Sequence, residues 1–131
     1  MFVDASALTA ILADEPELSY LVARLEKAET RETSPLAVWE TAVAVSRILS
    51  IPVPDARRAV SNYLENAGIT VVAIPPGAAD IALDALHRFG KGRHPARLNM
   101  GDCFAYAAAR QLGLPLLYKG DDFGRTDIDP A

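Results

Sequence analysis

Apolar positions recur along this chain in two patterns, one typical of buried strands and one typical of helices. Short apolar runs at 1–4 and 115–118, and the β-branched run 69–74, are typical of strands. Longer stretches place apolar residues at every third or fourth position, which forms one face of a helix. These predicted helices cover residues 7–13, 16–28, 35–50, 55–67, 78–89 and the stretch that follows Asn99 to about 112.

Residues that favour helix ends stand at several of these boundaries. Ser6 and Asn99 are placed to accept hydrogen bonds from the first turns of the helices that follow them. Ser34 precedes a proline, which is favoured at the first helical position. Gly90 and Gly113 stand where glycine commonly ends a helix. The sequence therefore predicts the bounds of these helices as well as their presence.

The order of these elements indicates the fold class. Strands alternate with helices, which is typical of α/β proteins. The run 69–74 is nearly all apolar, so we expect a strand buried on both faces, as in a parallel sheet covered by helices. The polar run 29–33 forms either a loop or a short strand. The predicted fold is α/β, with a mostly parallel central sheet flanked by helices.

Length and composition narrow the class of protein further. The chain has 131 residues, half of them apolar, which suits a single domain spanning 1–131. Asp4 interrupts the first apolar run and no long apolar stretch follows, so we expect neither a signal peptide nor a membrane span, and a cytoplasmic location. With Cys103 as the only cysteine, an internal disulfide and a thiolate-rich zinc site are excluded. The net charge of −4 argues against a general nucleic-acid coat protein.

Several acids fall where the carboxyl end of a parallel sheet would gather them. Asp4 ends the first strand, Glu40 lies early in a helix, Asp102 lies in the first turn after Asn99, and Asp121 follows the last strand. Clustered carboxylates repel one another, so they persist most easily around a divalent cation. Mg²⁺, with Mn²⁺ as a substitute, is the natural occupant. Taken singly, each acid also has a structural explanation in helix-dipole or turn chemistry.

Three segments, taken in order, carry a family resemblance. Residues 1–8 (MFVDASAL) form an apolar strand followed by Asp-X-Ser, residues 99–106 (NMGDCFAY) contain a Gly-Asp-Cys helix start, and residues 116–123 (LLYKGDDF) form a final strand and turn. Glu40 lies between the first and second segments. Together they resemble the PIN-domain family and, within it, the VapC-type toxin ribonucleases of type II toxin–antitoxin systems. The resemblance spans almost the whole chain.

The resemblance implies a PIN fold, magnesium-dependent endoribonuclease activity, a homodimer, and neutralisation by a cognate VapB-type antitoxin. It places Asp4 and Asp102 as the most secure metal ligands. The family's last acid usually follows a threonine by two residues, but this chain has Lys119 there, which leaves both Asp121 and Asp122 open. The acidic positions on the family pattern are filled by Asp4, Glu40, Asp102 and Asp121.

On this interpretation, a metal held by Asp4 and Asp102 polarises the scissile phosphate and lowers the pKa of bound water. Glu40 and Asp121 then orient that water or a second ion. Ser6 is either a hydrogen-bond donor to the Asp4 carboxylate or a helix cap, and both roles are compatible.

Other residues near these motifs have simpler interpretations. Asn99 is either a helix cap or a substrate contact. Cys103 is expected to be a buried small apolar residue rather than a nucleophile. Trp39 is expected in the core rather than stacked on a base. The apolar residues near the N-terminus are either core or a dimer face, and they are Leu8, Ile11 and Leu12.

A dense basic run precedes the Asn99 helix. An acidic protein that binds a polyanion beside its own carboxylates needs local positive charge, so this run is a candidate contact for the RNA backbone. The alternatives are a solvated loop turned by glycine and proline, or an antitoxin contact. The run consists of Arg88, Lys91, Arg93 and Arg97.

Two other functions compete with the ribonuclease. A phosphoacceptor or phosphatase α/β domain also uses an acid at a strand end, but Asp4 has no second acid two residues on and no acidic pair before it. A non-catalytic PIN-like binding module would keep the fold without the chemistry. Retention of every expected acid favours the enzyme.

Overall fold

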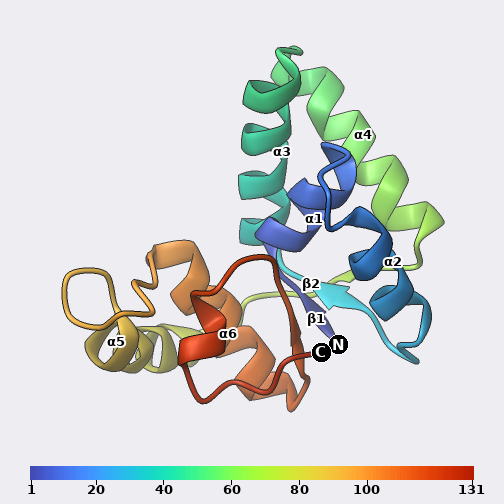
Figure 1. Cartoon of the computed structure of the whole chain (residues 1–131). Helices are drawn as coiled ribbons and strands as arrows, with labels where there is room; N and C mark the ends of the chain where they lie inside the picture. The colour runs from blue at the N-terminus through green and yellow to red at the C-terminus, as the bar shows by residue number, and fades with distance from the viewer.

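The computed structural model describes residues 1–131 and contains a small sheet between two groups of helices (Figure 1). The strands are β1 (Phe2–Val3), β2 (Glu32–Thr33), β3 (Thr70–Val71) and β4 (Leu116–Leu117). The helices are α1 (Ala5–Leu12), α2 (Leu18–Glu26), α3 (Pro35–Leu49), α4 (Val53–Asn66), α5 (Ala78–Phe89) and α6 (Met100–Leu112). A short 3-10 helix, η1 (Phe123–Arg125), follows β4.

The four strands form one sheet in the order β3-β2-β1-β4, and every pair is parallel. The predicted mostly parallel sheet with flanking helices is therefore confirmed. Phe2 lies opposite Glu32 on one side and Leu116 on the other, so β1 is central. Because all strands run the same way, the residues that follow β1, β2 and β4 lie at the same edge of the sheet.

The run 69–74 was expected to be a strand buried on both faces, and that prediction is wrong. Only Thr70 and Val71 pair as a strand, β3, and both are exposed. β3 lies at the edge of the sheet, where one side has no neighbouring strand. Apolar composition alone does not distinguish an edge strand from a central one.

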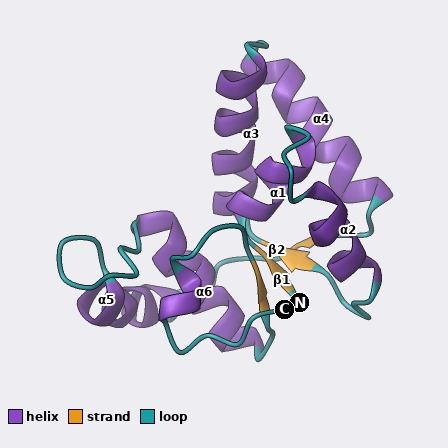
Figure 2. Cartoon of the chain, viewed as in Figure 1, coloured by secondary structure: helices purple, strands orange, loops and turns teal.

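The sheet separates two apolar clusters because successive residues of a strand point to opposite faces. Phe2 and Leu116 pack with α5 and α6, whereas Val3 and Leu117 pack with α1, α2 and α4. Figure 2 shows the short strands between these helical groups. None of the helices combines the length and apolar character that crossing a membrane demands.

The helix ends follow the sequence signals with one exception. Ser34 caps α3 by accepting a hydrogen bond from the Ala37 amide at 3.1 Å, and Gly113 ends α6 with a left-handed φ of 64°. At α1 the cap is Asp4, and Ser6 lies inside the helix. The prediction that Ser6 caps this helix is therefore wrong, because Asp4 already accepts the first-turn amide.

The structure corrects one expectation about apolar side chains and decides between two alternatives for others. Trp39 was expected in the core, but 63% of it is exposed. Leu8 and Ile11 were considered for a dimer face, but they are buried with Val3 in the core of this chain. Helical spacing of apolar residues is compatible with burial in the core and with an exposed or dimer-forming face. Only the packing of the helices in the structure distinguishes the two.

Candidate metal centre at the carboxyl edge of the sheet

Asp4 is the most deeply buried of the predicted site acids, with 3% of its surface exposed. It follows β1 directly, so its side chain sits where the chain leaves the sheet and enters α1. Its Oδ2 accepts hydrogen bonds from the Ser6 amide at 2.9 Å and from the Ser6 hydroxyl at 2.5 Å. Burial raises the pKa of Asp4, and the hydrogen bonds from Ser6 oppose that rise.

Ser6 connects the end of β1 to the end of β4. Its hydroxyl donates to Asp4 and accepts a hydrogen bond from the Lys119 amide at 3.0 Å. The Lys119 ammonium also pairs with Glu15, and with Glu17 at 3.4 Å, in the turn between α1 and α2. The side chain of Lys119 is thus held by two glutamates of the neighbouring turn.

Glu40 reaches the site from the second turn of α3, and its surroundings make it unusually easy to protonate. Burial, followed by the negative charges of Asp4 and Asp102, raises the pKa of Glu40 to about 7. Gly101 provides space for this carboxylate, because a Cβ atom built on Gly101 would overlap it. A larger residue before Asp102 would therefore have to displace the Glu40 carboxylate from its place against α6.

Asp102 lies in the first turn of α6 and is held there by reciprocal hydrogen bonds. The Asn99 amide donates to Asp102 Oδ2 at 2.8 Å, and the Asp102 amide donates to Asn99 Oδ1 at 3.0 Å. Burial raises the pKa of Asp102 to about 6, with further contributions from the charges of Asp4 and Asp122, while the Asn99 amide lowers it. Asn99 serves as the predicted cap, and substrate contact by Asn99 stays a prediction.

The loop after β4 contains two acids that the sequence could not tell apart. The charge of Asp122 contributes to the raised pKa of Asp102, whereas the charge of Asp121 acts on Tyr118. Both acids are exposed. The choice between Asp121 and Asp122 as the fourth acid of the site stays a prediction, although of the two only Asp122 raises the pKa of Asp102.

The donor set suits a hard cation. No group of three or more His, Cys, Asp or Glu side chains is placed so that it could hold a metal ion in this structure. Mg²⁺ does not need one, because it keeps several waters and takes only one or two protein carboxylates. The available donors near Asp4 are carboxylate and hydroxyl oxygens, and their mutual repulsion is relieved by positive charge. The residues present therefore fit Mg²⁺ or Mn²⁺.

Comparison with known proteins decides the family. The family model described as "PIN domain" matches residues 1–129. The chain belongs to the PIN domain family.

Similar proteins carry this PIN domain over almost the same length. "Ribonuclease VapC" of Mycolicibacterium smegmatis is 41% identical over 128 residues, covering 98% of this chain and 97% of the relative. A VapC ribonuclease of Rhizobium meliloti is 40% identical over 139 residues, covering 97% of this chain and 98% of the relative. The crystal structure of Mycobacterium tuberculosis VapC20, a Sarcin-Ricin loop cleaving toxin, superposes with a TM-score of 0.78. The match covers 99% of this chain and 97% of the VapC20 chain at 19% sequence identity. At this identity the superposition is evidence for the fold only.

The basic run of this PIN domain divides into two parts. Lys91, Arg93 and Arg97 are exposed around an open hollow in the loop between α5 and α6. Arg88, by contrast, lies on α5 and pairs with Asp127 at 2.7 Å and with Asp84 at 3.4 Å. The guanidinium of Arg88 is thus held by acids of the same chain, and its predicted contact with RNA stays a prediction.

Cys103 is buried behind the site and is a poor nucleophile. Burial, followed by the charge of Asp102, raises the pKa of its thiol to about 11. The thiolate is therefore scarce at neutral pH. The expectation of a buried, unreactive cysteine agrees with this environment.

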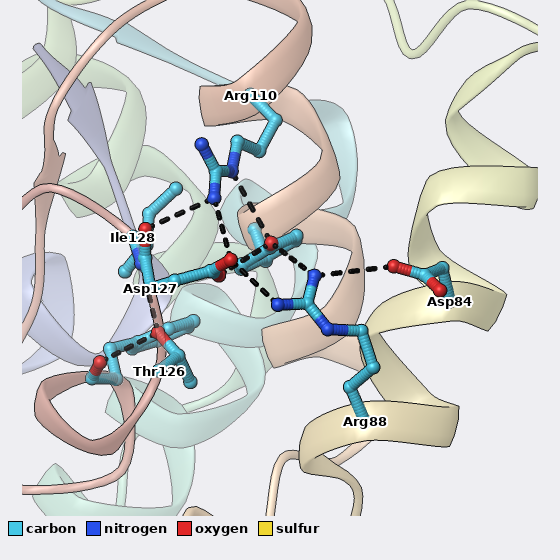
Figure 3. A network of polar contacts seen from close by, with 8 residues as sticks. Asp84, Arg88, Arg110, Thr126, Asp127 and Ile128 are labelled. Carbon is cyan, nitrogen blue, oxygen red and sulfur yellow. Dashed lines mark hydrogen bonds and ion pairs between the residues drawn. The ribbon is translucent and has the colours of Figure 1, made fainter.

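Sequence reasoning missed a polar network that joins α5 and α6 to the C-terminal segment around Asp127 (Figure 3). The Asp127 carboxylate accepts hydrogen bonds from Arg88 at 2.7 Å and from the Tyr106 hydroxyl at 2.8 Å, and it pairs with Arg110 at 3.0 Å. Tyr106 and Arg110 are four residues apart, so the sequence does place them on one helical face. Nothing in the sequence indicates that both meet the distant Asp127.

Proposed function

We propose that this PIN domain is a magnesium-dependent endoribonuclease and the toxin of a type II VapBC module. One observation carries the proposal: Asp4, Glu40 and Asp102 come from three separate parts of the chain, and the charge of Asp4 raises the pKa of both other acids while that of Asp102 raises the pKa of Glu40. Repulsion between carboxylates in a partly buried site is typical of functional acids more than of structural ones. The similarity to proteins named as VapC ribonucleases supplies the substrate class.

Asp4 and Asp102 would hold the cation, and Asp121 or Asp122 of the loop after β4 would complete the site. When bound, Mg²⁺ supplies charge that polarises a scissile phosphate and makes a nearby water more acidic. Glu40, whose pKa is about 7, is suited to orient the attacking water and accept its proton on a carboxylate oxygen near neutral pH. Ser6 and Asn99 fix the orientations of Asp4 and Asp102 through their hydrogen bonds.

The test of the activity is incubation of the purified, antitoxin-free protein with total RNA, in Mg²⁺ or in EDTA, followed by mapping of new 5′ ends. We expect discrete cuts in Mg²⁺ only. Asp102→Asn should abolish them, whereas Asp84→Asn, which removes an exposed acid on α5, should not. Cleavage that survives EDTA, or full activity of Asp102→Asn at saturating Mg²⁺, would contradict the proposal.

The RNA incubation, together with a labelling assay with a phosphodonor, separates the competing functions. A non-catalytic PIN-like module would bind RNA without new 5′ ends. A phosphoacceptor domain would instead be labelled at Asp4 by a small phosphodonor such as acetyl phosphate. Either result would refute the proposed ribonuclease activity in favour of the competing function.

The loop between α5 and α6 is proposed to contact the RNA backbone through Lys91, Arg93 and Arg97. Replacing Lys91 and Arg93 by alanine should weaken RNA binding whatever the RNA sequence. It should also flatten the slope of log K against log salt by up to about 1.4 for single-stranded RNA. The matched control replaces Arg57 and Arg58 of α4, which removes the same charge elsewhere. An unchanged slope, measured in Ca²⁺ to suppress turnover, would assign the loop to another role.

Neutralisation by a cognate VapB-type antitoxin is the second part of the proposal. A pocket of carboxylates attracts a guanidinium, which can pair with them bidentately in place of a metal. We therefore expect an antitoxin arginine to occupy the site. Co-expression with the chromosomal neighbour should yield a complex that does not cut RNA. A complex that cuts at the rate of the free protein would contradict this mode of inhibition.

A homodimer is proposed from the family resemblance. The apolar face of α1 is buried within the chain, so the dimer interface must use another surface. The exposed apolar residues Leu83 and Met100, 62% and 64% exposed, border a wholly apolar hollow between α5 and α6. If a second copy of the chain covers this surface, Leu83→Glu should sediment as a monomer while the parent sediments as a dimer. A parent that is monomeric at all concentrations would refute the dimer.

A further inference from the structure

The backbone that leaves β4 has no hydrogen-bonded ladder to hold it. The last hydrogen bond between β1 and β4 runs from the Asp4 amide to the Leu117 carbonyl at 2.9 Å. Residues 118–121 then form no hydrogen bond with another backbone group. The hydrogen bonds and ion pairs that hold this segment must therefore involve side chains.

Lys119 supplies such contacts at both of its ends. Its amide donates to the Ser6 hydroxyl at 3.0 Å, in the first turn of α1. Its ammonium pairs with Glu15, and with Glu17 at 3.4 Å, in the turn that follows α1. The Lys119 and Glu15 side chains are 33% and 25% exposed, so this ion pair is partly shielded from water and salt. Lys119 thus joins the two ends of α1.

Glu15 is a fixed anchor for this ion pair. Its amide donates to the Ala10 carbonyl at 2.9 Å, and its carbonyl accepts from the Leu18 amide at 3.0 Å. The backbone of Glu15 is therefore bound to α1 on one side and to α2 on the other. A side chain that pairs with Glu15 is held relative to α1, the helix that also contains Ser6.

The amide of Lys119 limits the direction of the Ser6 hydroxyl. A serine hydroxyl carries one proton and accepts through two lone pairs. Because a lone pair of Ser6 faces the Lys119 amide, the proton is directed at Asp4, whose Oδ2 lies 2.5 Å from the hydroxyl oxygen. Without that amide the hydroxyl would be free to rotate toward other acceptors. Two hydrogen bonds in series therefore connect the Lys119 backbone to the Asp4 carboxylate.

We propose that Lys119 is a positioning residue: its ion pair with Glu15 holds its own amide on Ser6, and this orients the Ser6 hydroxyl toward Asp4. The inference rests on the proposed function, because it takes Asp4 as a ligand of the divalent cation. It assigns Lys119 no chemical step and no contact with the cation. The threonine usual at this place in the family pattern cannot form such an ion pair, so the device belongs to this chain.

The test measures the affinity of the full chain for Mn²⁺ alone by titration calorimetry. Lys119→Met removes the ammonium and keeps the amide. It should weaken binding by about three- to tenfold, at or below the lower end for residues that touch a metal ligand directly. Charge alone predicts the opposite result, because removing one cation near a site favours the binding of another. A weaker affinity therefore reports lost orientation.

Two matched variants control for charge. Lys27→Met removes the charge of an exposed lysine at the end of α2, and it should bind Mn²⁺ like the parent. Lys119→Arg keeps a cation within reach of Glu15 and should also bind like the parent. A loss of affinity in either control as large as that in Lys119→Met would overturn the inference.

Ser6→Ala supplies the second arm of a double-mutant cycle. If Lys119 acts through Ser6, adding Lys119→Met to Ser6→Ala should cause no further loss of affinity. Losses that multiply, or an unchanged affinity in a folded Lys119→Met protein, would show that Lys119 has only a structural role. If Lys119→Met does not fold, Glu15→Gln decides by the same cycle, because it weakens the ion pair from the other side.

The outcomes separate this inference from the proposed function. Mn²⁺ binding with the expected coupling, but without RNA cleavage, would refute the ribonuclease and leave the positioning role standing. RNA cleavage with no coupling between Ser6 and Lys119 would refute the positioning role alone. A parent protein that binds no Mn²⁺ would overturn both.

Discussion

Replacing Asp102 by asparagine should stabilise the metal-free protein while removing its activity. Asparagine is nearly isosteric, and its side-chain oxygen can still accept the hydrogen bond from the Asn99 amide. The change removes only the negative charge that burial and the neighbouring acids disfavour. A residue kept for its chemistry, and not for the fold, should behave in this way.

The size of the effect follows from the pKa of Asp102, which rises from 3.8 to about 6 in the folded protein. One pKa unit corresponds to about 1.4 kcal/mol, so ionising Asp102 costs the folded state at most about 3 kcal/mol. Asparagine loses a helix-dipole contribution of about 0.3–1 kcal/mol. We therefore expect a net gain of about 2 kcal/mol in the free energy of unfolding, or about 6–10 °C in melting temperature.

The stability difference between Asp102→Asn and the parent should depend on pH, and the raised pKa of Asp102 fixes its direction. A raised pKa means that the folded protein binds the proton more tightly than the unfolded chain does. Stability from this group is therefore present below pH 4 and is lost as pH rises through about 6. The variant should gain stability over the parent at pH 8, and most of that gain should disappear at pH 4.

The assay is urea and thermal denaturation of the parent and Asp102→Asn in EDTA at pH 4, 6 and 8. Asp84→Asn, which changes an exposed acid, should match the parent at every pH. A variant less stable than the parent at pH 8 would refute the reasoning, because it would show that Asp102 contributes to the fold rather than to a strained site.

Three further predictions concern the neighbours of the acids. Ser6→Ala should weaken Mn²⁺ binding by about tenfold with little change in fold, because the Asp4 carboxylate loses its hydroxyl donor; an unchanged affinity in calorimetry would contradict this. Gly101→Ala should displace the Glu40 carboxylate and reduce RNA cleavage, while the melting temperature is maintained by the higher helix propensity of alanine. Cys103→Ala should keep full cleavage activity, and its loss in a folded protein would reopen a role for the thiol.

Local signals in the sequence were sufficient for much of the fold. The prediction of a helix at 78–89 matches α5 residue for residue, and Asn99 and Gly113 bound α6 as expected. These signals act within one or two turns of the chain, so they require no knowledge of distant contacts. The acids Asp4, Glu40 and Asp102 were also found in this way, because strand ends and helix starts identify the edge of a parallel sheet.

Features that depend on distant contacts could not be predicted. The choice between Asp121 and Asp122 depends on how the loop after β4 lies relative to α6, which no local signal in the sequence indicates. Trp39 was assigned to the core because its neighbours are apolar, yet the packing of α3 leaves it exposed. Asp127 had no recognisable motif, because its partners are 17 to 39 residues away in the sequence.

The central claim is that Asp4 and Asp102 share a divalent cation, and a crystal grown or soaked in Mn²⁺ tests it most directly. The anomalous difference map should contain a peak within about 2.3 Å of a carboxylate oxygen of each residue. The peak should be absent from Asp102→Asn crystals treated in the same way. A map with no peak at the carboxyl edge of the sheet, or with its strongest peak elsewhere on the chain, would contradict the claim.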